Sequence, residues 1–169
     1  MPGFPKRNSN RPLPREASAM SGFQLPDDLM YNRGAITDPL AYARERGNAS
    51  WLFIVGDEFA SMPQGMSYEQ VKAAVPHTAR VVSDPPRVLD LELARQHVKA
   101  LDTLPRPTLV SCRTGPRASA VAYMYAGLKA GASYEDVMSA AQSEQAPFCA
   151  FPEYTQWVRL SMASLAARE

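Results

Sequence analysis

Apolar runs and amphipathic segments alternate along the chain after residue 33. Residues 50–55 form a continuous apolar run typical of a buried strand, and residues 79–83 and 107–111 are shorter runs of the same kind. Between the last two runs, apolar side chains recur at the spacing of one helix face, at Leu91, Ala94, Val98 and Leu101. Strands that alternate with helices predict an α/β domain, with a central, mostly parallel sheet flanked by helices.

Capping residues mark the ends of the other expected helices. Proline suits the first helical position, serine and aspartate accept the free N–H groups of a first turn, and glycine adopts the left-handed conformation that ends a helix. We therefore expect helices that start near Pro39, Ser67, Ser133 and Pro152, and helix ends at Gly47 and Gly131.

The first 33 residues differ in composition from the rest. They are rich in proline and arginine and contain few acids, so they cannot bury enough apolar surface to fold alone. We expect residues 1–33 to be a flexible segment and residues 34–169 to form one domain. The segment lacks the apolar stretch of a secretory signal peptide, and its composition is compatible with an organelle transit peptide. The expected location is the cytoplasm, or an organelle if the segment is a transit peptide.

Charge and cysteine content exclude several classes of function. A net charge of +1 gives no general attraction to nucleic acid or to a membrane surface, and no apolar run is long enough to span a membrane. The two cysteines, Cys112 and Cys149, make no disulfide framework. Neither they nor His77 and His97 show the spacing of metal ligands, so we expect no metal and no other cofactor. The sequence indicates no oligomeric state.

The candidate chemistry lies around Cys112. The apolar run 107–111 leads into a short loop that holds this cysteine, Arg113, Gly115 and Arg117, and the next segment is apolar nearly all round, as in a buried helix. The N–H groups and dipole at the start of such a helix favour an anion, and together with the two arginines they favour the thiolate. A lone cysteine is often only a small buried side chain. Two unpaired guanidinium groups in one turn would be costly, however, so we favour a nucleophile in an anion site.

Several short motifs resemble those of the cysteine-dependent phosphatase superfamily, which includes tyrosine and dual-specificity phosphatases. They look closest to the bacterial phosphatase-like domain that also occurs in beta-lactamase-hydrolase-like proteins. The matching pieces are residues 35–37, 51–55, 63–69, 104–107, 112–117 (Cys-Arg-Thr-Gly-Pro-Arg) and 131–136. The resemblance implies a phosphatase-like fold, with the nucleophile loop between a strand and a buried helix.

The resemblance also implies an activity, the hydrolysis of phosphate monoesters through a cysteinyl-phosphate intermediate. Cys112 would attack phosphorus, and Arg117 would clamp the phosphate oxygens. The substrate would be a phosphorylated small molecule or a phosphoprotein. The implied phosphate-binding residues are Arg113, Thr114, Gly115, Pro116, Arg117, Ala118 and Ser119.

A general acid would protonate the leaving oxygen in such a reaction. Asp84 has the place of this acid in the family, after a strand and before the helix that leads to the nucleophile strand. An aspartate before two prolines is equally typical of a helix cap. Asp90 and Glu92 are weaker substitutes for the acid.

Two features depart from the phosphatase signature. Four residues separate Cys112 from Arg117, one fewer than in the signature, although Gly115 and Ser119 keep the usual spacing from the cysteine. Either Arg117 is shifted within a loop of normal length, or the loop is one residue tighter. In addition, Ser111 stands where most phosphatases have histidine.

Two other functions fit the same loop. A cysteine followed by Arg113, Gly115 and Arg117 also resembles the active loop of rhodanese sulfurtransferases, in which the cysteine carries a persulfide. A non-catalytic phosphate-binding module, or pseudophosphatase, would need Arg117 and the loop backbone but no acid.

Two further expectations concern the surroundings of the loop. The irregular segments 59–66 and 148–151 are candidates for the pocket wall. If Cys149 lay near Cys112, the two thiols would form a protective disulfide on oxidation.

Overall fold

Four parallel strands form the central sheet, in the order β1-β4-β2-β3. They are β1 (Leu29–Tyr31), β2 (Ser50–Phe53), β3 (His77–Arg80) and β4 (Thr108–Ser111). The computed structural model describes residues 22–166. β2 and β4 lie in the middle of the sheet and are buried along their whole length, as continuous apolar runs predict. The expected α/β fold with a parallel sheet is therefore confirmed.

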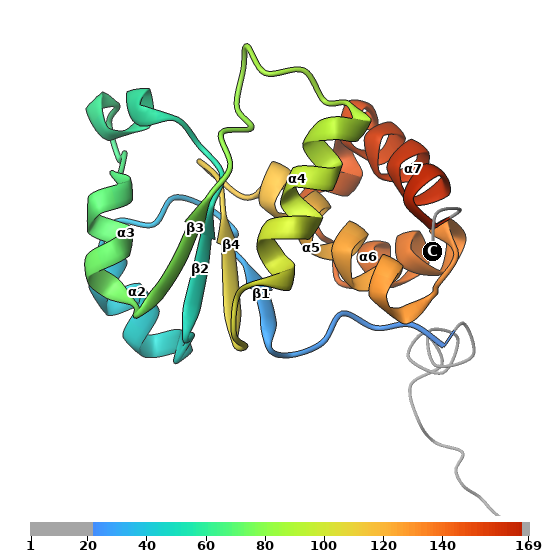
Figure 1. The fold of residues 1–169 in the computed structure, drawn as a ribbon, viewed down its shortest axis with the longest axis horizontal. Coiled ribbons are helices and arrows are strands. Elements are labelled where there is room, and N and C mark those ends of the chain that lie inside the picture. The colour runs from blue at the N-terminus through green and yellow to red at the C-terminus, as the bar shows by residue number, and fades with distance from the viewer. Residues whose placement is uncertain (1–21, 167–169) are drawn as a thin grey trace, which may run out of the picture.

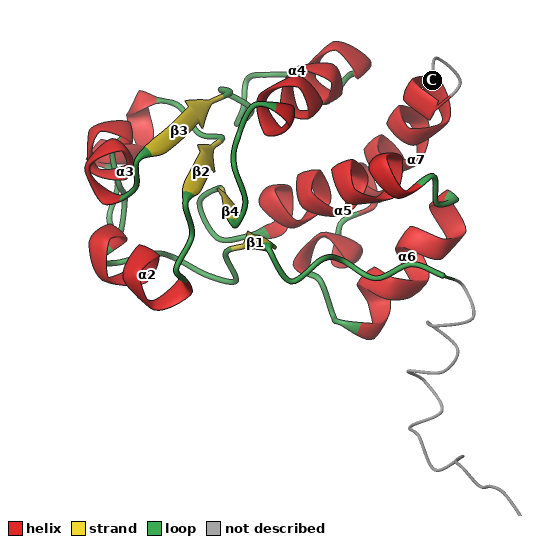
Figure 2. Cartoon of the chain, turned by 60° about the horizontal axis from the view of Figure 1, so that its bottom comes forward, coloured by secondary structure: helices red, strands yellow, loops and turns green. Residues whose placement is uncertain are grey.

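Helices cover both faces of the sheet (Figures 1 and 2). One face carries α2 (Pro39–Arg46) and α3 (Tyr68–Ala74), and the other carries α4 (Leu91–Asp102), α5 (Pro116–Ala130), α6 (Tyr134–Ser143) and α7 (Pro152–Ala166). Short 3-10 helices, η2 (Asp57–Ser61) and η3 (Pro147–Ala150), lie in the connections. α5 packs directly on β4 and β1. The loop that joins β4 to α5 lies at the carboxyl edge of the sheet, because it directly follows a strand of this parallel sheet.

The predicted helix ends are confirmed where a capping residue specifies them. Asp38 accepts the N–H of Ala41 at the start of α2, and Ser67 forms the expected capping box with Gln70 before α3. The other confirmed ends are Gly47, Gly131, Ser133 and Pro152.

The helix after the cysteine loop is the most buried of the helices that the structure describes. Residues 117–128 of α5 are all buried. Gly127 allows α6 and α7 to approach this helix closely, because a Cβ there would meet the side chains of Val137 and Met162. Burial of residues 117–128 therefore fixes the position of α5 against the sheet and the neighbouring helices.

Two predicted strands are shorter than their apolar runs. The run 50–55 contains β2 at Ser50–Phe53, and the run 79–83 overlaps β3 at His77–Arg80. Residues 54 and 55 are still almost fully buried. In the run 79–83, by contrast, Val82 is 48% exposed. β3 begins two residues before this run and ends at Arg80, although the N–H groups of Val81 and Ser83 still donate to the carbonyls of Phe53 and Ile54.

Part of the segment expected to be flexible belongs to the fold. Leu29–Tyr31 forms β1, and the side chains of Phe23 and Asn32 are buried. A strand of three residues is too short to show a periodic pattern, so its pairing with β4 is a tertiary property. The expected boundary at residue 34 is corrected, because the fold includes Phe23. Residues 1–21 and 167–169 lie outside the described residues, and the flexibility of 1–21 stays a prediction.

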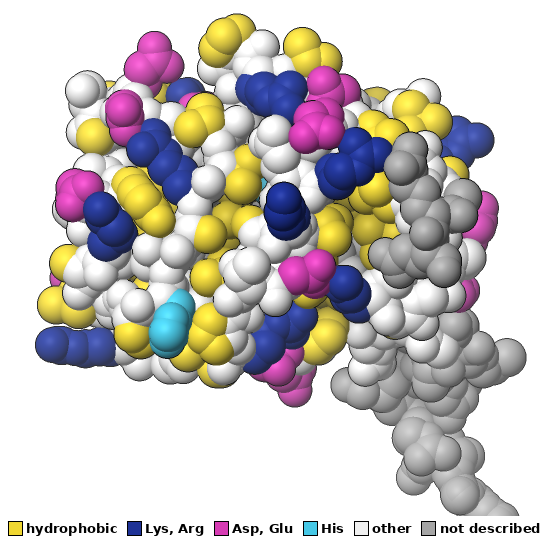
Figure 3. Space-filling view, viewed as in Figure 1, with side chains coloured by type: hydrophobic (Ala, Val, Ile, Leu, Met, Phe, Trp, Pro, Cys, Tyr) yellow, Lys and Arg dark blue, Asp and Glu magenta, His cyan; other side chains and the backbone are white. Residues whose placement is uncertain are grey.

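The surface carries charges of both signs. Figure 3 shows lysine and arginine side chains interspersed with acids over one face, without a continuous basic area among the described residues of that face. None of the described helices combines the length and the apolar character needed to cross a lipid bilayer.

Candidate active site

Cys112 lies at the carboxyl end of β4, where the chain turns into α5. The residue is 6% exposed, and its Sγ accepts hydrogen bonds from the N–H groups of Gly115 at 3.1 Å and Ala118 at 3.3 Å. These N–H groups belong to the start of a helix, where backbone donors have no partner within the helix. The sulfur thus occupies a position that favours a negative charge, at the positive end of the α5 dipole.

The same two contacts show how the loop is arranged. Gly115 is the third residue after Cys112 and Ala118 is the sixth, and α5 begins at Pro116. The sulfur therefore meets the N–H of the residue that follows Arg117, and Arg117 itself lies in the first turn of the helix.

Gly115 is required by the backbone conformation of the turn. Its φ angle is 120°, a region that residues with side chains rarely adopt. A Cβ at this position would also overlap the carbonyl oxygen of Asn32. Only glycine allows the loop to pass this close to the chain after β1.

Asn32 holds the backbone of Cys112 in place. Its Nδ2 donates to the Cys112 carbonyl at 3.1 Å, and its Oδ1 accepts the Cys112 N–H at 3.2 Å. Asn32 is fully buried, and its Nδ2 also donates to the carbonyl of Gly34. The composition of the first 33 residues does not predict this role. The one local signal is a short apolar triplet, residues 29–31, followed by a turn at Gly34.

Arg117 lines the same pocket as Cys112. The residue is 8% exposed, its Nη2 donates to the Tyr154 hydroxyl at 3.3 Å, and its Cζ lies 5.4 Å from the centre of the Tyr154 ring. Its Nη1 is buried and has no hydrogen-bond partner among the described residues. Such a buried group is costly to leave unpaired. The sequence pattern assigns Tyr154 to the core, and its place beside Arg117 is a finding of the structure.

Asp84 and Arg113 form an ion pair on the wall of this pocket. The Oδ2 of Asp84 accepts from Arg113 Nη2 at 3.0 Å, and its Oδ1 accepts the N–H of Gly56 at 3.1 Å. Asp84 is 6% exposed, and the Nε of Arg113 is buried without a partner among the described residues. The structure thus brings Cys112, Arg117, Arg113 and Asp84 together.

The helix cap predicted as an alternative role for Asp84 is provided by Asp90 instead. Asp84 does not cap a helix, because α4 begins later and Asp90 caps it by accepting the N–H of Leu93. This hydrogen bond, followed by the nearby charge of Arg87, lowers the pKa of Asp90. Glu92 pairs with Arg95 on the helix surface. Neither Asp90 nor Glu92 lines the Cys112 pocket, so the structure does not bring these substitutes to the site.

The remaining predicted loop residues fall into two groups. Thr114 and Pro116 line the pocket. Ser119 does not: its N–H donates to the carbonyl of Gly115, and its hydroxyl donates to Pro116 and accepts from the N–H of Phe148. Both polar groups of Ser119 therefore have partners within the fold, and the structure does not bring this residue to the pocket.

The pocket around Cys112 has a volume of about 280 Å³ and is open to solvent. A water molecule takes about 30 Å³, so the pocket has room for a group of several non-hydrogen atoms. Its walls come from the loop after β3, the loop after β4, and the start of α7 with Phe151, Glu153 and Tyr154. Of the predicted wall segments, 148–151 contributes Phe151, whereas 59–66 contributes no lining residue. Phe59 instead packs its ring 5.9 Å from the Arg113 guanidinium.

Ser111 and Cys149 do not line the Cys112 pocket. The Ser111 Oγ is fully buried and accepts the indole N–H of Trp51 at 2.8 Å. Cys149 is a free thiol like Cys112, it does not line the Cys112 pocket, and burial raises its pKa. The structure gives no support to a disulfide between them. Across residues 22–166, no group of three His, Cys, Asp or Glu side chains is placed to hold a metal ion.

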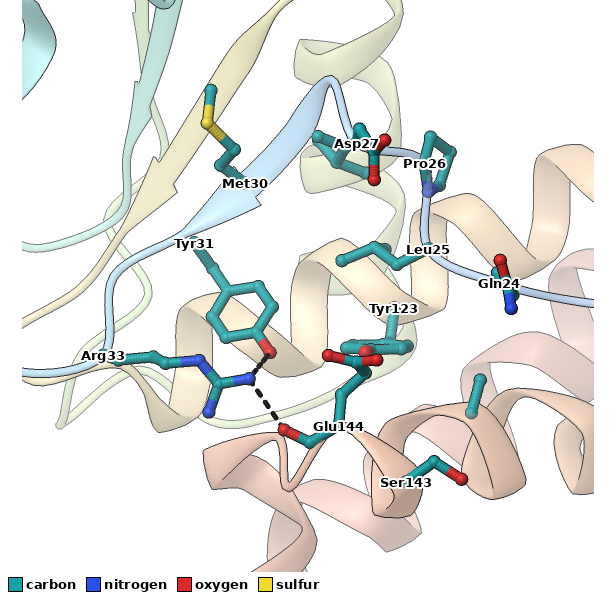
Figure 4. Close-up of a pocket in the computed structure, with 12 residues that line it drawn as sticks. Gln24, Leu25, Pro26, Asp27, Met30, Tyr31, Arg33, Tyr123, Ser143 and Glu144 are labelled. Atoms are coloured by element: carbon teal, nitrogen blue, oxygen red, sulfur yellow. Dashed lines mark hydrogen bonds between the residues drawn. The ribbon is translucent and has the colours of Figure 1, made fainter. Parts of the chain in front are cut away.

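A second pocket, of about 370 Å³, lies beside β1 (Figure 4). Tyr31 and Arg33 line it together with Tyr123 of α5 and Glu144. Arg33 Nη2 donates to the Tyr31 hydroxyl at 2.7 Å and to the Glu144 carbonyl at 2.9 Å. None of the predicted site residues lines this pocket, so the candidate chemistry stays with the Cys112 pocket.

Solved phosphatase structures share this fold. The DUF442 protein of Shewanella putrefaciens CN-32, provisionally assigned as a phosphatase, is 19% identical, covers 84% of this chain and 88% of its own, and has a TM-score of 0.59. Human DUSP28 is 15% identical over 86% of this chain and 99% of its own, with a TM-score of 0.57. The core catalytic domain of the S. cerevisiae PP-IP phosphatase SIW14, in complex with citrate, is 13% identical over 86% of this chain and 94% of its own, with a TM-score of 0.55. No protein-family model and no curated protein matches the chain.

Proposed function

We propose that this chain, whose fold is that of the cysteine-dependent phosphatases, hydrolyses phosphate monoesters with Cys112 as the nucleophile. One observation carries the proposal. The sulfur of Cys112 accepts two backbone N–H groups at the start of α5, in a pocket that Arg113 and Arg117 also line. A thiol beside backbone donors and arginine side chains in one pocket is what attack on a phosphate requires.

In the first step, the Cys112 thiolate attacks phosphorus and the bond from phosphorus to the ester oxygen breaks. The electron pair of that bond goes to the leaving oxygen, which takes a proton from Asp84 and departs as an alcohol or phenol. Arg117 and the N–H groups at the start of α5 hold the phosphate oxygens during the transfer.

Asp84 must gain a proton before it can donate one. In the structure it accepts hydrogen bonds from Arg113 and Gly56 through both oxygens. An entering phosphate competes with Asp84 for the Arg113 guanidinium, because both are anions that pair with arginine. Substrate binding would thereby release Asp84 to take up the proton that the leaving group needs.

In the second step, water attacks phosphorus and the bond from sulfur to phosphorus breaks. The electron pair returns to sulfur, inorganic phosphate leaves, and Asp84 accepts the proton of the attacking water. Cys112 and Asp84 are thereby restored to their starting states.

The first experiment measures phosphate release from 4-nitrophenyl phosphate between pH 5 and pH 8 by the natural chain and by Cys112→Ser. We expect turnover that falls by at least about a thousandfold in the variant, because a serine hydroxyl is a far weaker nucleophile than a thiolate. Cys149→Ser is the matched control, since this thiol lies outside the pocket, and it should retain turnover.

The role of Asp84 requires a second substrate. Asp84→Asn should lose about 10²–10⁴-fold in rate on phenyl phosphate, a poor leaving group, and much less on 4-nitrophenyl phosphate, whose phenolate leaves without a proton. Equal losses in rate on both substrates would show that Asp84 only positions other groups and does not donate the proton. Phosphate binding without turnover of either ester would overturn the enzymatic proposal and indicate a binding module.

A further inference from the structure

The mouth of the Cys112 pocket carries an acid and two aromatic rings from the start of α7. Phe151 is 41% exposed, and its ring meets Tyr154 edge to face, with 5.7 Å between ring centres. Glu153, between them, is exposed and lines the pocket. It forms no ion pair with any residue of 22–166. A substrate bound at Cys112 would pass this acid and these rings.

The arginines around the pocket are largely paired with acids already. The pairs are Arg113 with Asp84 at 3.0 Å, Arg80 with Asp57 at 2.7 Å and Arg87 with Asp90 at 3.3 Å. Asp84 also lines a neighbouring groove, and this groove contains a further acid, Glu58. Glu58 forms no ion pair among the described residues. The surroundings of the pocket therefore offer a bound substrate no excess of positive charge.

One phosphate group is well matched by this site, and a second is not. The first would meet Arg117, the backbone donors at the start of α5 and a share of Arg113. Another phosphate or carboxylate on the same molecule would lie near Glu153 with no cation to pair with. Salt screens the repulsion between like charges only when they are farther apart than the Debye length, which is about 8 Å at physiological salt. An aromatic ester would instead pack on Phe151, whose ring is available for edge or face contact.

On this basis, and resting on the proposed function, we propose that Glu153 is a specificity-determining residue of the Cys112 site. It restricts the substrate to singly phosphorylated aryl esters that carry no further negative charge beside the phosphate. Polyphosphorylated molecules are disfavoured, in contrast to the PP-IP substrate class in the name of the yeast protein that shares this fold.

The test compares two phosphotyrosine peptides of equal length at low ionic strength, one flanked by Asp and Glu and the other by Lys and Ser. We expect kcat/KM for the basic peptide to exceed that for the acidic one by about tenfold, and inositol hexakisphosphate to be hydrolysed far more slowly than either. Glu153→Lys should reduce or invert the ratio between the two peptides.

Glu135→Lys is the matched control. Glu135 is also an exposed acid at the second position of a helix, α6, so its replacement loses the same interaction with a helix dipole far from the pocket. It should leave the peptide ratio unchanged. An unchanged ratio in Glu153→Lys, or equal shifts in both variants, would overturn the role of Glu153.

The two proposals fail in different ways. If none of these phosphate esters is turned over, the proposed phosphatase function fails. If the peptides are turned over with equal kcat/KM, or inositol hexakisphosphate is the best substrate, the phosphatase function stands and the inference about specificity is wrong.

Discussion

Asn32 makes reciprocal hydrogen bonds with the backbone of Cys112, although 80 positions separate the two residues. Its amide group satisfies both the N–H and the C=O of the cysteine at the point where β4 ends. These backbone groups are buried and have left the sheet ladder, so they would otherwise have no partner from regular structure. Asn32 thereby connects the strand β1 to the geometry of the nucleophile loop.

Replacing Asn32 should damage activity more than a typical buried substitution. Asn32→Ala leaves two buried backbone groups of Cys112 unpaired, at a cost of about 1–3 kcal/mol for each. We expect a loss of stability in urea unfolding together with a loss of kcat on 4-nitrophenyl phosphate. Asn48→Ala is the control, because Asn48 is also buried but donates only to Ser50, away from the pocket. A normal kcat in folded Asn32→Ala would refute the positioning role.

Gly115 and Gly131 provide a second comparison. Gly115→Ala combines a positive φ with an overlap between Cβ and Asn32, which predicts a destabilisation of about 2–5 kcal/mol. Gly131 also has a positive φ, but a Cβ there meets no atom within 4 Å, so Gly131→Ala should cost only about 1 kcal/mol. Chemical denaturation of both variants measures the difference. Equal costs would mean that the loop can move away from Asn32.

His97 makes the stability of the protein depend on pH. It is fully buried on α4, its Nε2 lies 2.6 Å from the Ser83 Oγ, and the edge of its ring faces Trp157. Burial, followed by the charges of Arg117 and Arg87, lowers its pKa from 6.5 to about 3. The neutral imidazole is thus the form that the fold accepts.

The sign of the pH effect follows from this pKa. Between pH 6.5 and about 3, the unfolded chain binds a proton at His97 that the folded chain does not. The free energy of unfolding should therefore fall as the pH drops through this window, by up to about 1.4 kcal/mol per pH unit from this residue. Urea unfolding at several pH values should show a shallower dependence for His97→Gln. An identical slope in that variant would assign the effect to other groups.

Tyr123 carries a hydroxyl that the described residues do not satisfy. The residue is fully buried beside the pocket of Figure 4, and its oxygen has no hydrogen-bond partner among them. Burial, followed by the nearby Tyr31 hydroxyl, raises its pKa, so it stays a neutral phenol. Tyr123→Phe should stabilise the protein by about 1 kcal/mol in thermal unfolding, because it removes an unpaired polar group and keeps the ring.

Tyr125 on the same helix is the control for this substitution. Its hydroxyl donates to Asp102 at 2.7 Å, so Tyr125→Phe should instead destabilise the protein by about 1 kcal/mol. If both substitutions destabilise, the nearby Tyr31 hydroxyl or a solvent molecule already satisfies Tyr123.

Local sequence determined the features that depend on neighbours in the chain. Asp38, Ser67 and Ser133 cap their helices because a cap needs only the N–H groups of the following turn. The order of strand, loop and helix around Cys112 is local in the same way, since the helix start supplies the donors that meet the sulfur. These elements were predictable because residues at most six positions apart decide them.

Tertiary structure alone decided which distant groups meet at the site. Asn32 comes from a segment whose composition predicts no folding, and it is ordered by the pairing of β1 with β4. Asp84 reaches Arg113, and Tyr154 reaches Arg117, across 29 and 37 positions. No periodicity reports such contacts, because they arise from the packing of separate elements at one edge of the sheet. The sequence by itself determined the order of strand, Cys112 loop and helix, and the packing of β1, β3 and α7 determined what surrounds that loop.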